Sequence, residues 1–287
     1  MTTKKFRVDL HVHTKGSDGR SSASEIVERA LACGLDGIAI TDHHKVRTAE
    51  GDAVADLAEH CGLKVLRGVE YSSAGGHMLL FGVDDRLVAS FGLYRDAQDV
   101  VDRVNRAGGC VVVSHPFRGY RRAFGAKVQD LRGLAGWEGY NGQCSYEVVG
   151  ANEASTKLAA KTRTRTTGGS DAHDARDVGL CWTEFDAAVT TDKALVRALR
   201  RTGHRGRLDE KRLAGYRVWR TAMTTATLNL DKPVGSALLL DGGTSDPATL
   251  SYRTNPCATE SWRCWSEAPA CPAPWYNLPK GVDSRKA

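Results

Sequence analysis

The stretch Val8-Asp9-Leu10-His11-Val12-His13-Thr14 is the part of the chain that decides the fold. It is typical of a buried strand, and because side chains alternate along a strand, His11 and His13 are expected to project from the same side. Asp18 follows in the next loop, five residues after His13. A lone His-x-His pair is weak evidence of a metal site, because histidines on strand faces also form ordinary hydrogen bonds to backbone.

Similar units recur along the chain, each within or just after a short apolar run. They are Thr41-Asp42-His43-His44, Gly68-Val69-Glu70, Gly75-Gly76-His77, Ser114-His115-Pro116-Phe117-Arg118 and Gly169-Ser170-Asp171-Ala172-His173. Side chains at the ends of many strands can converge at one face of a barrel. The repetition therefore favours a single site of imidazoles and carboxylates, which are ligands that zinc, manganese and iron accept.

Between these units the pattern alternates strand and helix. Strands are expected at residues 6–11, 37–41, 64–69, 77–82, 110–113, 164–167 and 182–185. Helices are expected from a cap at Ser22 or Ser24 to a stop at Gly34, and at about 48–60, 94–107, 151–161 and 192–202. Such alternation predicts a mainly parallel α/β fold. A barrel is the economical way to gather the strand ends, although an open doubly wound sheet fits the same pattern.

Taken in order, these motifs resemble those of the PHP (polymerase and histidinol phosphatase) family of metal-dependent phosphoesterases. The resemblance covers roughly residues 6–205, and six ordered motifs are far more specific than any one of them. It implies a distorted, TIM-like (β/α)7 barrel over residues 1–205. Residues 206–287 would then form a C-terminal extension, either poorly ordered or a strap that docks its tryptophans on the barrel or on another subunit.

The resemblance also implies a centre of three divalent metal ions, Mn, Zn or Fe. One ion would be bound by His11, His13, Glu70 and Asp171, a second would share Glu70 and add His77 and His115, and a third would be bound by Asp18, His43 and His173. A hydroxide shared between such ions is a nucleophile at neutral pH, and the ions neutralise the anionic ester. His77 has a second interpretation, as a residue that caps a strand.

Four further residues are candidates for catalysis or substrate binding. Arg118 is expected to grip two phosphate oxygens beside the metals. Asp42 is expected to orient His43 or a neighbouring loop. His44 lines the pocket or donates a proton in one interpretation, and is an ordinary loop histidine in the other. Asn141 resembles a family position near the substrate, but Tyr140-Asn141-Gly142 also fits a simple turn. Arg121 and Arg122 are expected to form a solvated basic loop.

These observations predict hydrolysis of a small phosphomonoester by a metal-bridging hydroxide. The Ser-Asp-Gly form of the first motif and the His-Pro-Phe-Arg form of the fifth resemble the stand-alone branch that includes nucleotide phosphatases, so a nucleotide is the preferred substrate. Three alternatives remain: an exonuclease acting on oligonucleotide ends, a histidinol-phosphate phosphatase, and a non-catalytic metal-binding accessory subunit. Nucleic acid is the less favoured partner because no aromatic and basic stacking platform stands out.

Composition adds broad limits. The 287 residues are 41% hydrophobic, which is ample for a large core, and the net charge of +6 suits an anionic substrate. Apolar runs are too short to span a membrane and the first residues lack the apolar core of a signal peptide, so a cytoplasmic protein is expected. Of the eight cysteines, five are expected to be free thiols rather than disulfide partners, namely Cys33, Cys61, Cys110, Cys144 and Cys181. Cys257, Cys264 and Cys271 recur every seven residues, but no histidine accompanies them as a zinc site would favour. The oligomeric state is left open.

Overall fold

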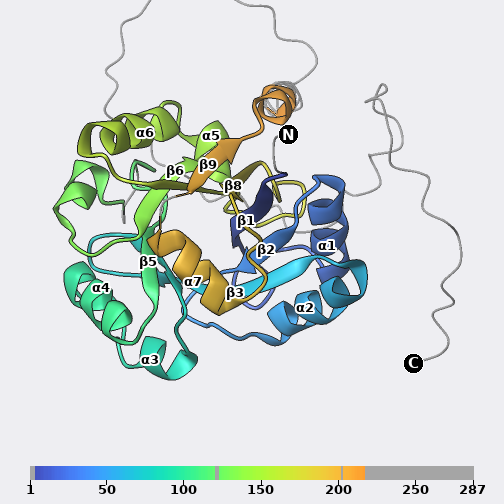
Figure 1. Ribbon diagram of the computed structural model, residues 1–287, viewed down its shortest axis with the longest axis horizontal. Coiled ribbons are helices and arrows are strands. Elements are labelled where there is room, and N and C mark those ends of the chain that lie inside the picture. Colours follow the sequence, from blue (N-terminus) through green and yellow to red (C-terminus); the bar gives the residue numbers. More distant parts are fainter. Residues whose placement is uncertain (1–3, 120–122, 202, 217–287) are drawn as a thin grey trace, which may run out of the picture. The chain divides into compact units, whose positions relative to one another are not determined.

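The computed structural model describes residues 4–119, 123–201 and 203–216. They form one sheet surrounded by helices, with strand order β7-β6-β5-β4-β3-β2-β1-β8-β9 (Figure 1). The strands are β1 (Phe6–Val12), β2 (Gly37–Ile40), β3 (Lys64–Ser72), β4 (His77–Phe81), β5 (Cys110–Val113), β6 (Gly136–Asn141), β7 (Thr166–Gly169), β8 (Cys181–Phe185) and β9 (His204–Leu208). The helices are α1 (Ala23–Ala32), α2 (Ala49–Cys61), α3 (Asp85–Ala89), α4 (Ala97–Arg106), the 3-10 helix η1 (Gly125–Asp130), α5 (Gly142–Glu147), α6 (Ala151–Thr162) and α7 (Asp192–Arg200).

The sheet is a nearly closed α/β barrel, as the sequence predicted, but it contains nine strands in the described residues rather than seven. Parallel pairs run through β1-β2-β3 and β5-β6-β7. Strands β4, β8 and β9 pair antiparallel, β4 between β3 and β5, and β8-β9 beside β1. The two strands beyond the expected seven are β6 and β9. Only β3 and β4 are joined by a short turn, which an antiparallel pair permits, whereas α3 and α4 lie between β4 and β5, and α7 lies between β8 and β9.

The barrel closes where β7 meets the antiparallel pair β8-β9, and glycine makes this approach possible. A methyl group at Gly168 would lie 2.4 Å from the carbonyl oxygen of Trp182, and one at Gly206 would lie 2.4 Å from that of Thr167. The Thr183 hydroxyl fastens the seam, because it accepts from the amide of Gly168 and donates to its carbonyl, both at 2.9 Å. The backbones of these strands lie too close together for a side chain at Gly168 or Gly206.

Replacing Gly168 by alanine is therefore expected to destabilise the barrel. The added methyl group would force the two strands apart, at a cost of about 1–3 kcal/mol in the free energy of unfolding. Denaturant unfolding would measure the loss, with Gly215→Ala as the control because a methyl group there meets open space. Equal stability of the two variants would contradict the tight seam.

Helix α7 lies across one end of the barrel (Figure 1). Its Leu195 and Leu199 form one buried cluster with Leu10, Leu79 and Val112 from strands β1, β4 and β5. On the outside, α1 and α2 pack against β1 and β2, and α4 packs against β4 and β5. This end of the barrel is thus filled with apolar side chains, and the polar motifs occupy the opposite ends of the strands.

Local signals placed most helices well. The Ser22 hydroxyl accepts a hydrogen bond from the amide of Glu25, and the Glu25 carboxylate accepts one from the amide of Ser22. The expected cap at Ser22 is therefore a complete capping box. Thr48 caps α2 in the same way by accepting from Gly51. The short elements α3, η1 and α5 and the strands β6 and β9 were not predicted. No helix in the described part of the chain has the length and apolar character that crossing a membrane requires.

The sheet continues past the expected boundary at residue 205, because β9 pairs with β8 as far as Leu208 and residues 210–216 are helical. The rest of the C-terminal extension, including its tryptophans and its last three cysteines, lies outside the described residues, as do Arg121 and Arg122. The five cysteines within the described residues, Cys33, Cys61, Cys110, Cys144 and Cys181, are free thiols.

Candidate metal centre

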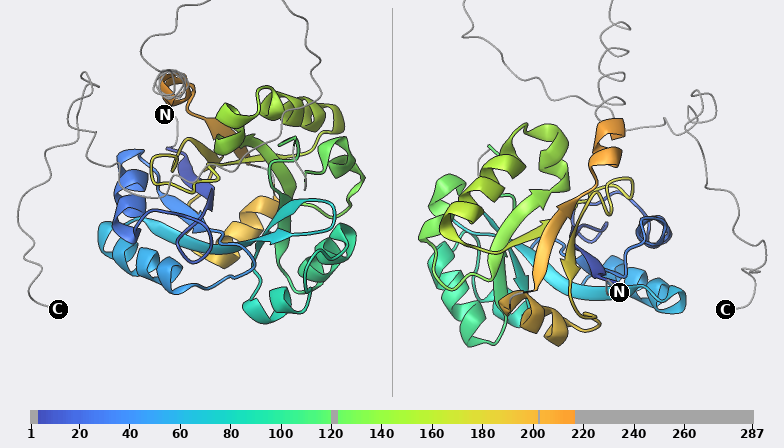
Figure 2. Two further views of the ribbon diagram at one scale, coloured as in Figure 1. Left: turned by 180° about the vertical axis from the view of Figure 1, so that it is seen from behind. Right: turned by 45° about the horizontal axis from the view of Figure 1, so that its top comes forward.

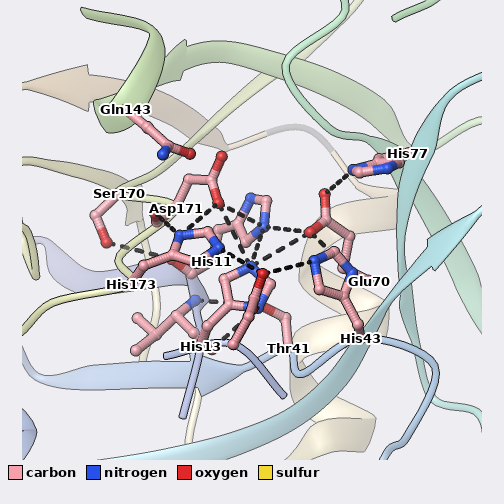
Figure 3. Close-up of polar contacts among 12 residues, drawn as sticks. His11, His13, Thr41, His43, Glu70, His77, Gln143, Ser170, Asp171 and His173 are labelled. Carbon is pink, nitrogen blue, oxygen red and sulfur yellow. Dashed lines mark hydrogen bonds and ion pairs between the residues drawn. The ribbon is translucent and has the colours of Figure 1, made fainter. Parts of the chain in front are cut away.

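The polar motifs meet at one end of the barrel (Figure 3). Three strands, β1, β3 and β4, and the segments after β1, β2, β5 and β7 contribute side chains to three overlapping groups of potential ligands. Isolated bridges between His43 and Glu70 and between Val12 and Ala172 hold the strand ends together. The groups are His11, His13, Glu70 and Asp171; Glu70, His77 and His115; and His13, Asp18, His43 and His173.

The first group is fully buried and has the spacing of a metal site. The Nε2 atoms of His11 and His13 are 3.1 Å apart, and they lie 3.2 Å and 3.3 Å from Oε2 of Glu70. Both also lie 3.4 Å from Oδ1 of Asp171. Ligand atoms around a tetrahedral zinc ion are about 3.4 Å apart at usual bond lengths. These donors therefore fit a divalent ion between them.

The second group shares the Glu70 carboxylate through its other oxygen. Oε1 of Glu70 lies 3.1 Å from Nδ1 of His77 and 3.1 Å from Nε2 of His115. The two oxygens of Glu70 therefore face different groups, which is the arrangement that lets one carboxylate bridge two ions. The geometry gives His77 a place in the cluster rather than a position away from it.

The third group lies on the exposed side of the cluster. Oδ2 of Asp18 is 3.1 Å from Nε2 of His173 and 3.5 Å from Nε2 of His43, and Oδ1 is 3.4 Å from Nδ1 of His13. The Asp18 side chain is 50% exposed and those of His43 and His173 are 25% and 22% exposed, whereas no side chain of the first group exceeds 2%. Solvent therefore reaches the cluster from this side.

The electrostatics of the cluster fit a cation. Burial alone would raise the pKa of Glu70, but the neighbouring His11, His115 and His13 outweigh it and hold this pKa well below the ordinary value. Asp171 behaves alike: burial opposes its ionisation, and the nearby imidazoles lower its pKa. Oδ1 of Asp171 is buried and accepts no hydrogen bond within the described residues. A buried anionic oxygen without a hydrogen bond is costly unless an ion balances it.

Backbone strain accompanies two of these residues. His115 has φ 25° and Asp171 has φ 56°, both in the left-handed region that non-glycine residues seldom adopt. Such strain persists only where the surrounding structure fixes it, and it is common at functional sites. Here the backbone of His115 is held by its amide donating to Oε2 of Glu138 at 2.8 Å.

Glu138 holds two of the candidate ligands, His11 and His115, by hydrogen bonds, and it was not among the predicted site residues. Its Oε1 accepts from the Nδ1–H of His11 at 2.9 Å, so the Nε2 atom of His11 keeps its lone pair toward the first group. Its Oε2 accepts from the amide of His115 and from Nδ2 of Asn141, both at 2.8 Å. Glu138 is fully buried in β6, and nothing in the sequence around it marked it as a site residue.

The Glu138→Gln variant is expected to bind metal about 10- to 100-fold more weakly than the wild type. One side of the carboxylate would become an NH2 group, and the amides that now donate to Oε2 would face a donor instead of an acceptor. Titration calorimetry with manganese would measure the affinity, with the exposed Glu28→Gln as the control. An unchanged affinity would show that Glu138 does not orient His11.

Asp42 fastens the loop that carries Asp18. Its carboxylate accepts from the amide and hydroxyl of Thr14 at 2.7 Å and 2.6 Å, and from the hydroxyls of Ser17 and Thr48 at 2.7 Å each. It is buried, and these contacts match the expectation that it orients a neighbouring loop. Its predicted role is therefore the support of the Asp18 loop and not contact with the reacting atoms.

Arg118 borders the cluster at Asp171. Its guanidinium donates from Nη1 to Oδ2 of Asp171 at 3.3 Å, and from Nη2 to Oε1 of Gln143 at 2.6 Å and to Oε2 of Glu147 at 3.5 Å. Burial lowers its pKa, but Asp171, Cys144 and Glu147 more than compensate and the net shift is upward. Gln143 and Glu147, both on α5, were not predicted as site residues because nothing in their spacing marks them.

The other two candidates, Asn141 and His44, lie beside Asp171 and beside His43 respectively. Asn141 is fully buried, caps α5 by accepting from Cys144 at 2.9 Å, and donates to Oδ2 of Asp171 at 3.3 Å. These contacts make it a support for Asp171. The ring of His44 is half-buried, 6.2 Å from that of His43 and 5.4 Å from that of Tyr71 between centroids. It lies at the edge of the cluster, where its role as a proton donor stays a prediction.

Comparison with known proteins supports this interpretation of the fold and motifs. A family model of the PHP domain matches residues 9–121, and a model described as PHP-associated matches residues 149–202. An uncharacterised protein of Methanocaldococcus jannaschii is 25% identical over 147 residues, which cover 47% of this chain and 82% of that protein. A 5'-3' exoribonuclease of Haemophilus influenzae is 38% identical over 71 residues, and the match spans 25% of this chain and 24% of the relative.

Two solved structures share the fold. PsfC from Pseudomonas syringae has a TM-score of 0.56 at 18% identity and matches 77% of this chain and 100% of its own. A two-domain protein from Bacteroides vulgatus, described as containing a PHP-like metal-dependent phosphoesterase, has a TM-score of 0.54 at 19% identity, with 71% of this chain and 65% of that one covered. The chain belongs to the PHP family of metal-dependent phosphoesterases, which confirms the family expected from the sequence motifs.

Proposed function

We propose that this protein hydrolyses a small phosphomonoester, with a nucleotide as the substrate class, at a centre of three divalent ions. The observation that carries this proposal is the convergence of three ligand groups around Glu70, with the Arg118 guanidinium beside them. Manganese, zinc and iron all suit imidazoles mixed with carboxylates. The ligands in this proposal are His11, His13, Asp18, His43, Glu70, His77, His115, Asp171 and His173.

Bound ions would supply Lewis acidity, which lowers the pKa of water and offsets the charge of the phosphoryl group. The chain's own residues prepare the site for that chemistry. Glu70 stays ionised between two ligand groups, and Glu138 fixes the ring of His11. Asp42 holds the loop of Asp18 and thereby supports the exposed ligand group.

Arg118 is placed to bind the phosphoryl group. A guanidinium has five N–H donors, and the described hydrogen bonds use two of its nitrogens to reach Asp171, Gln143 and Glu147. The Arg118 side chain is 23% exposed, so its remaining donors are open to a ligand. A planar, permanently charged group in this position can hold two oxygens of a phosphomonoester while the cluster engages the reacting side.

A nucleotide remains the preferred substrate on the form of the sequence motifs. The relatives add two phosphodiester substrates for comparison, because one is named an exoribonuclease and another, from Eggerthella lenta, a phosphoribosyl 1,2-cyclic phosphate 1,2-diphosphodiesterase. Each of these matches covers about a quarter of this chain and of the relative. The experiment should therefore include both monoesters and diesters.

The test is phosphate release by the manganese-loaded full chain from an aryl phosphate, nucleoside monophosphates, nucleoside bisphosphates, histidinol phosphate and short oligonucleotides. The proposal expects the largest kcat/KM on a nucleotide. Shortening of oligonucleotides without turnover of monoesters would favour the exonuclease alternative. Bound metal with no product from any substrate would overturn the proposal in favour of a non-catalytic role.

Metal binding is expected to release protons. In the metal-free site, burial lowers the pKa values of His11, His13 and His43. The surrounding carboxylates raise these pKa values by more than burial lowers them, so the net shift is upward. These rings therefore hold protons that a metal must displace, and the apparent affinity should increase as the pH rises. Calorimetry in two buffers of different ionisation enthalpy would count the protons, and buffer-independent heat would contradict the prediction.

A further inference from the structure

The segment that follows β9 binds the loop that carries two of the proposed ligands. Residues 210–216 leave β9 as a short helix, drawn in orange in Figure 2. The Arg212 guanidinium donates from Nη1 to the carbonyl of Val178 at 3.2 Å and from Nη2 to that of Arg176 at 2.8 Å. Before it, the amide of Asp209 donates to the carbonyl of Leu180 at 2.9 Å. Three backbone carbonyls of one loop are thus held from a single segment.

That loop begins at the metal centre. Asp171 and His173 stand at its start, and it is tied to the Asp18 loop because the amide of Arg20 donates to the carbonyl of His173 at 2.8 Å. His173 and Asp18 belong to the most exposed ligand group. Movement of residues 174–180 would therefore displace the ligands of that group before those of the buried groups, because its side chains are more exposed.

The same segment also contacts α5, the helix whose Gln143 and Glu147 accept hydrogen bonds from Arg118. The Tyr216 hydroxyl donates to Asp177 of the loop, and the Tyr216 ring stacks on Tyr146 of α5 with centroids 5.1 Å apart. The Tyr146 hydroxyl donates to the other oxygen of Asp177 at 3.3 Å. Asp177 is 6% exposed, so this pair of hydroxyls joins the loop, α5 and the segment at one buried carboxylate.

We infer that residues 209–216 act as a clamp that positions the His173 loop for metal binding and α5 for the support of Arg118. Arg212 and Tyr216 are its positioning residues, because their contacts given above are with the loop and with Tyr146 of α5. The inference rests on the proposed metal centre. It adds a requirement that lies beyond residue 205, where the sequence motifs end.

The first test compares Arg212→Met with Lys211→Met in the full chain. Both remove one cation from the same segment, but Lys211 is exposed. R212M is expected to weaken the most loosely bound manganese about tenfold, the low end for residues that support metal ligands. Free manganese measured by electron paramagnetic resonance would give the affinity without activity. The manganese activation curve should shift equally, and kcat should recover at saturating metal.

Arg212→Lys covers the case in which R212M unfolds, because it keeps the charge and the aliphatic stem but lacks the fork that reaches two carbonyls. Its manganese affinity should fall between those of the wild type and R212M. Wild-type affinity and activation in a folded R212M or R212K would overturn the clamp. Wild-type protein that binds no manganese would instead overturn the proposed function, so the two failures are distinct.

Tyr216→Phe tests the contact with Asp177 while keeping the ring on Tyr146. The variant is expected to raise KM severalfold with a smaller change in kcat, because α5 and Arg118 lose a fixed position. The double variant with Asp177→Asn should be no worse than Asp177→Asn alone if Tyr216 acts through that carboxylate. Additive effects, or an unchanged KM in Y216F, would overturn this part of the inference.

Discussion

Replacing Glu70 by alanine is expected to reduce phosphate release by about a thousandfold, on the scale of losing a major electrostatic contributor to the transition state. Glu70 faces one ligand group with each carboxylate oxygen, and its Oε2 is also 3.6 Å from Nδ1 of His43. No other side chain in the described cluster belongs to both the first and the second group. Its loss should therefore remove two ion positions at once.

Metal content separates this expectation from simple unfolding. Elemental analysis of Glu70→Ala after dialysis should show fewer bound ions than the wild type, and Glu28→Ala, on the exposed side of α1, should retain them all. Circular dichroism would establish that both variants fold. A folded Glu70→Ala with normal metal content and normal turnover would contradict the bridging role of this carboxylate.

Replacing Arg118 by lysine is expected to have a different effect, namely a loss of about 100-fold in kcat/KM with unchanged metal content. Lysine keeps the positive charge but cannot offer two parallel donors to a phosphoryl group, and each charge-assisted hydrogen bond contributes about 1.5–3 kcal/mol. The variant would also weaken the contacts to Gln143 and Glu147 that now fix the guanidinium.

Steady-state kinetics and metal analysis of Arg118→Lys would be compared with Arg197→Lys, an exposed arginine of α7. If Arg118 binds ground state and transition state alike, KM rises and kcat holds; if it acts chiefly in the transition state, kcat falls. A kcat/KM equal to that of the control would exclude Arg118 from phosphate binding. A loss of metal would instead assign it to support of Asp171.

The sequence predicted the convergence of the site because strand periodicity and chain order determine it. His11 and His13 lie on one side of a strand, and their Nε2 atoms do meet at 3.1 Å. Glu70 lies in β3 and Asp171 lies just after β7, so a barrel brings them together whatever their separation in the chain. The order and spacing of the motifs were therefore enough to predict which ligand side chains lie close together.

The supporting residues could not be predicted because their partners are distant and carry no pattern. Glu138 becomes important only when β6 lies beside His11 and His115, which are far from it in the sequence. Gln143 and Glu147 depend on the place of α5, a helix of six residues that leaves little periodic signal. Asn141 signalled a turn, and its contact with Asp171 needed the folded chain.

Strand β9 was missed for a related reason. Its sequence, His204-Arg205-Gly206-Arg207-Leu208, has basic residues where an apolar alternation would mark a strand. Arg205 and Arg207 instead lie near the Glu184 carboxylate of β8, and Gly206 provides the close approach to β7. Cross-strand charge pairs and a glycine contact replaced the hydrophobic signal, and the expected domain boundary consequently fell within the strand.

The most direct test of the metal-dependent phosphoesterase proposal is phosphate release from a nucleoside monophosphate as manganese is returned to chelator-stripped protein. The proposal predicts no turnover without metal, and turnover that rises with added ion and saturates near three equivalents per chain. Full turnover by the stripped protein, or none at any metal concentration on any monoester, would contradict it.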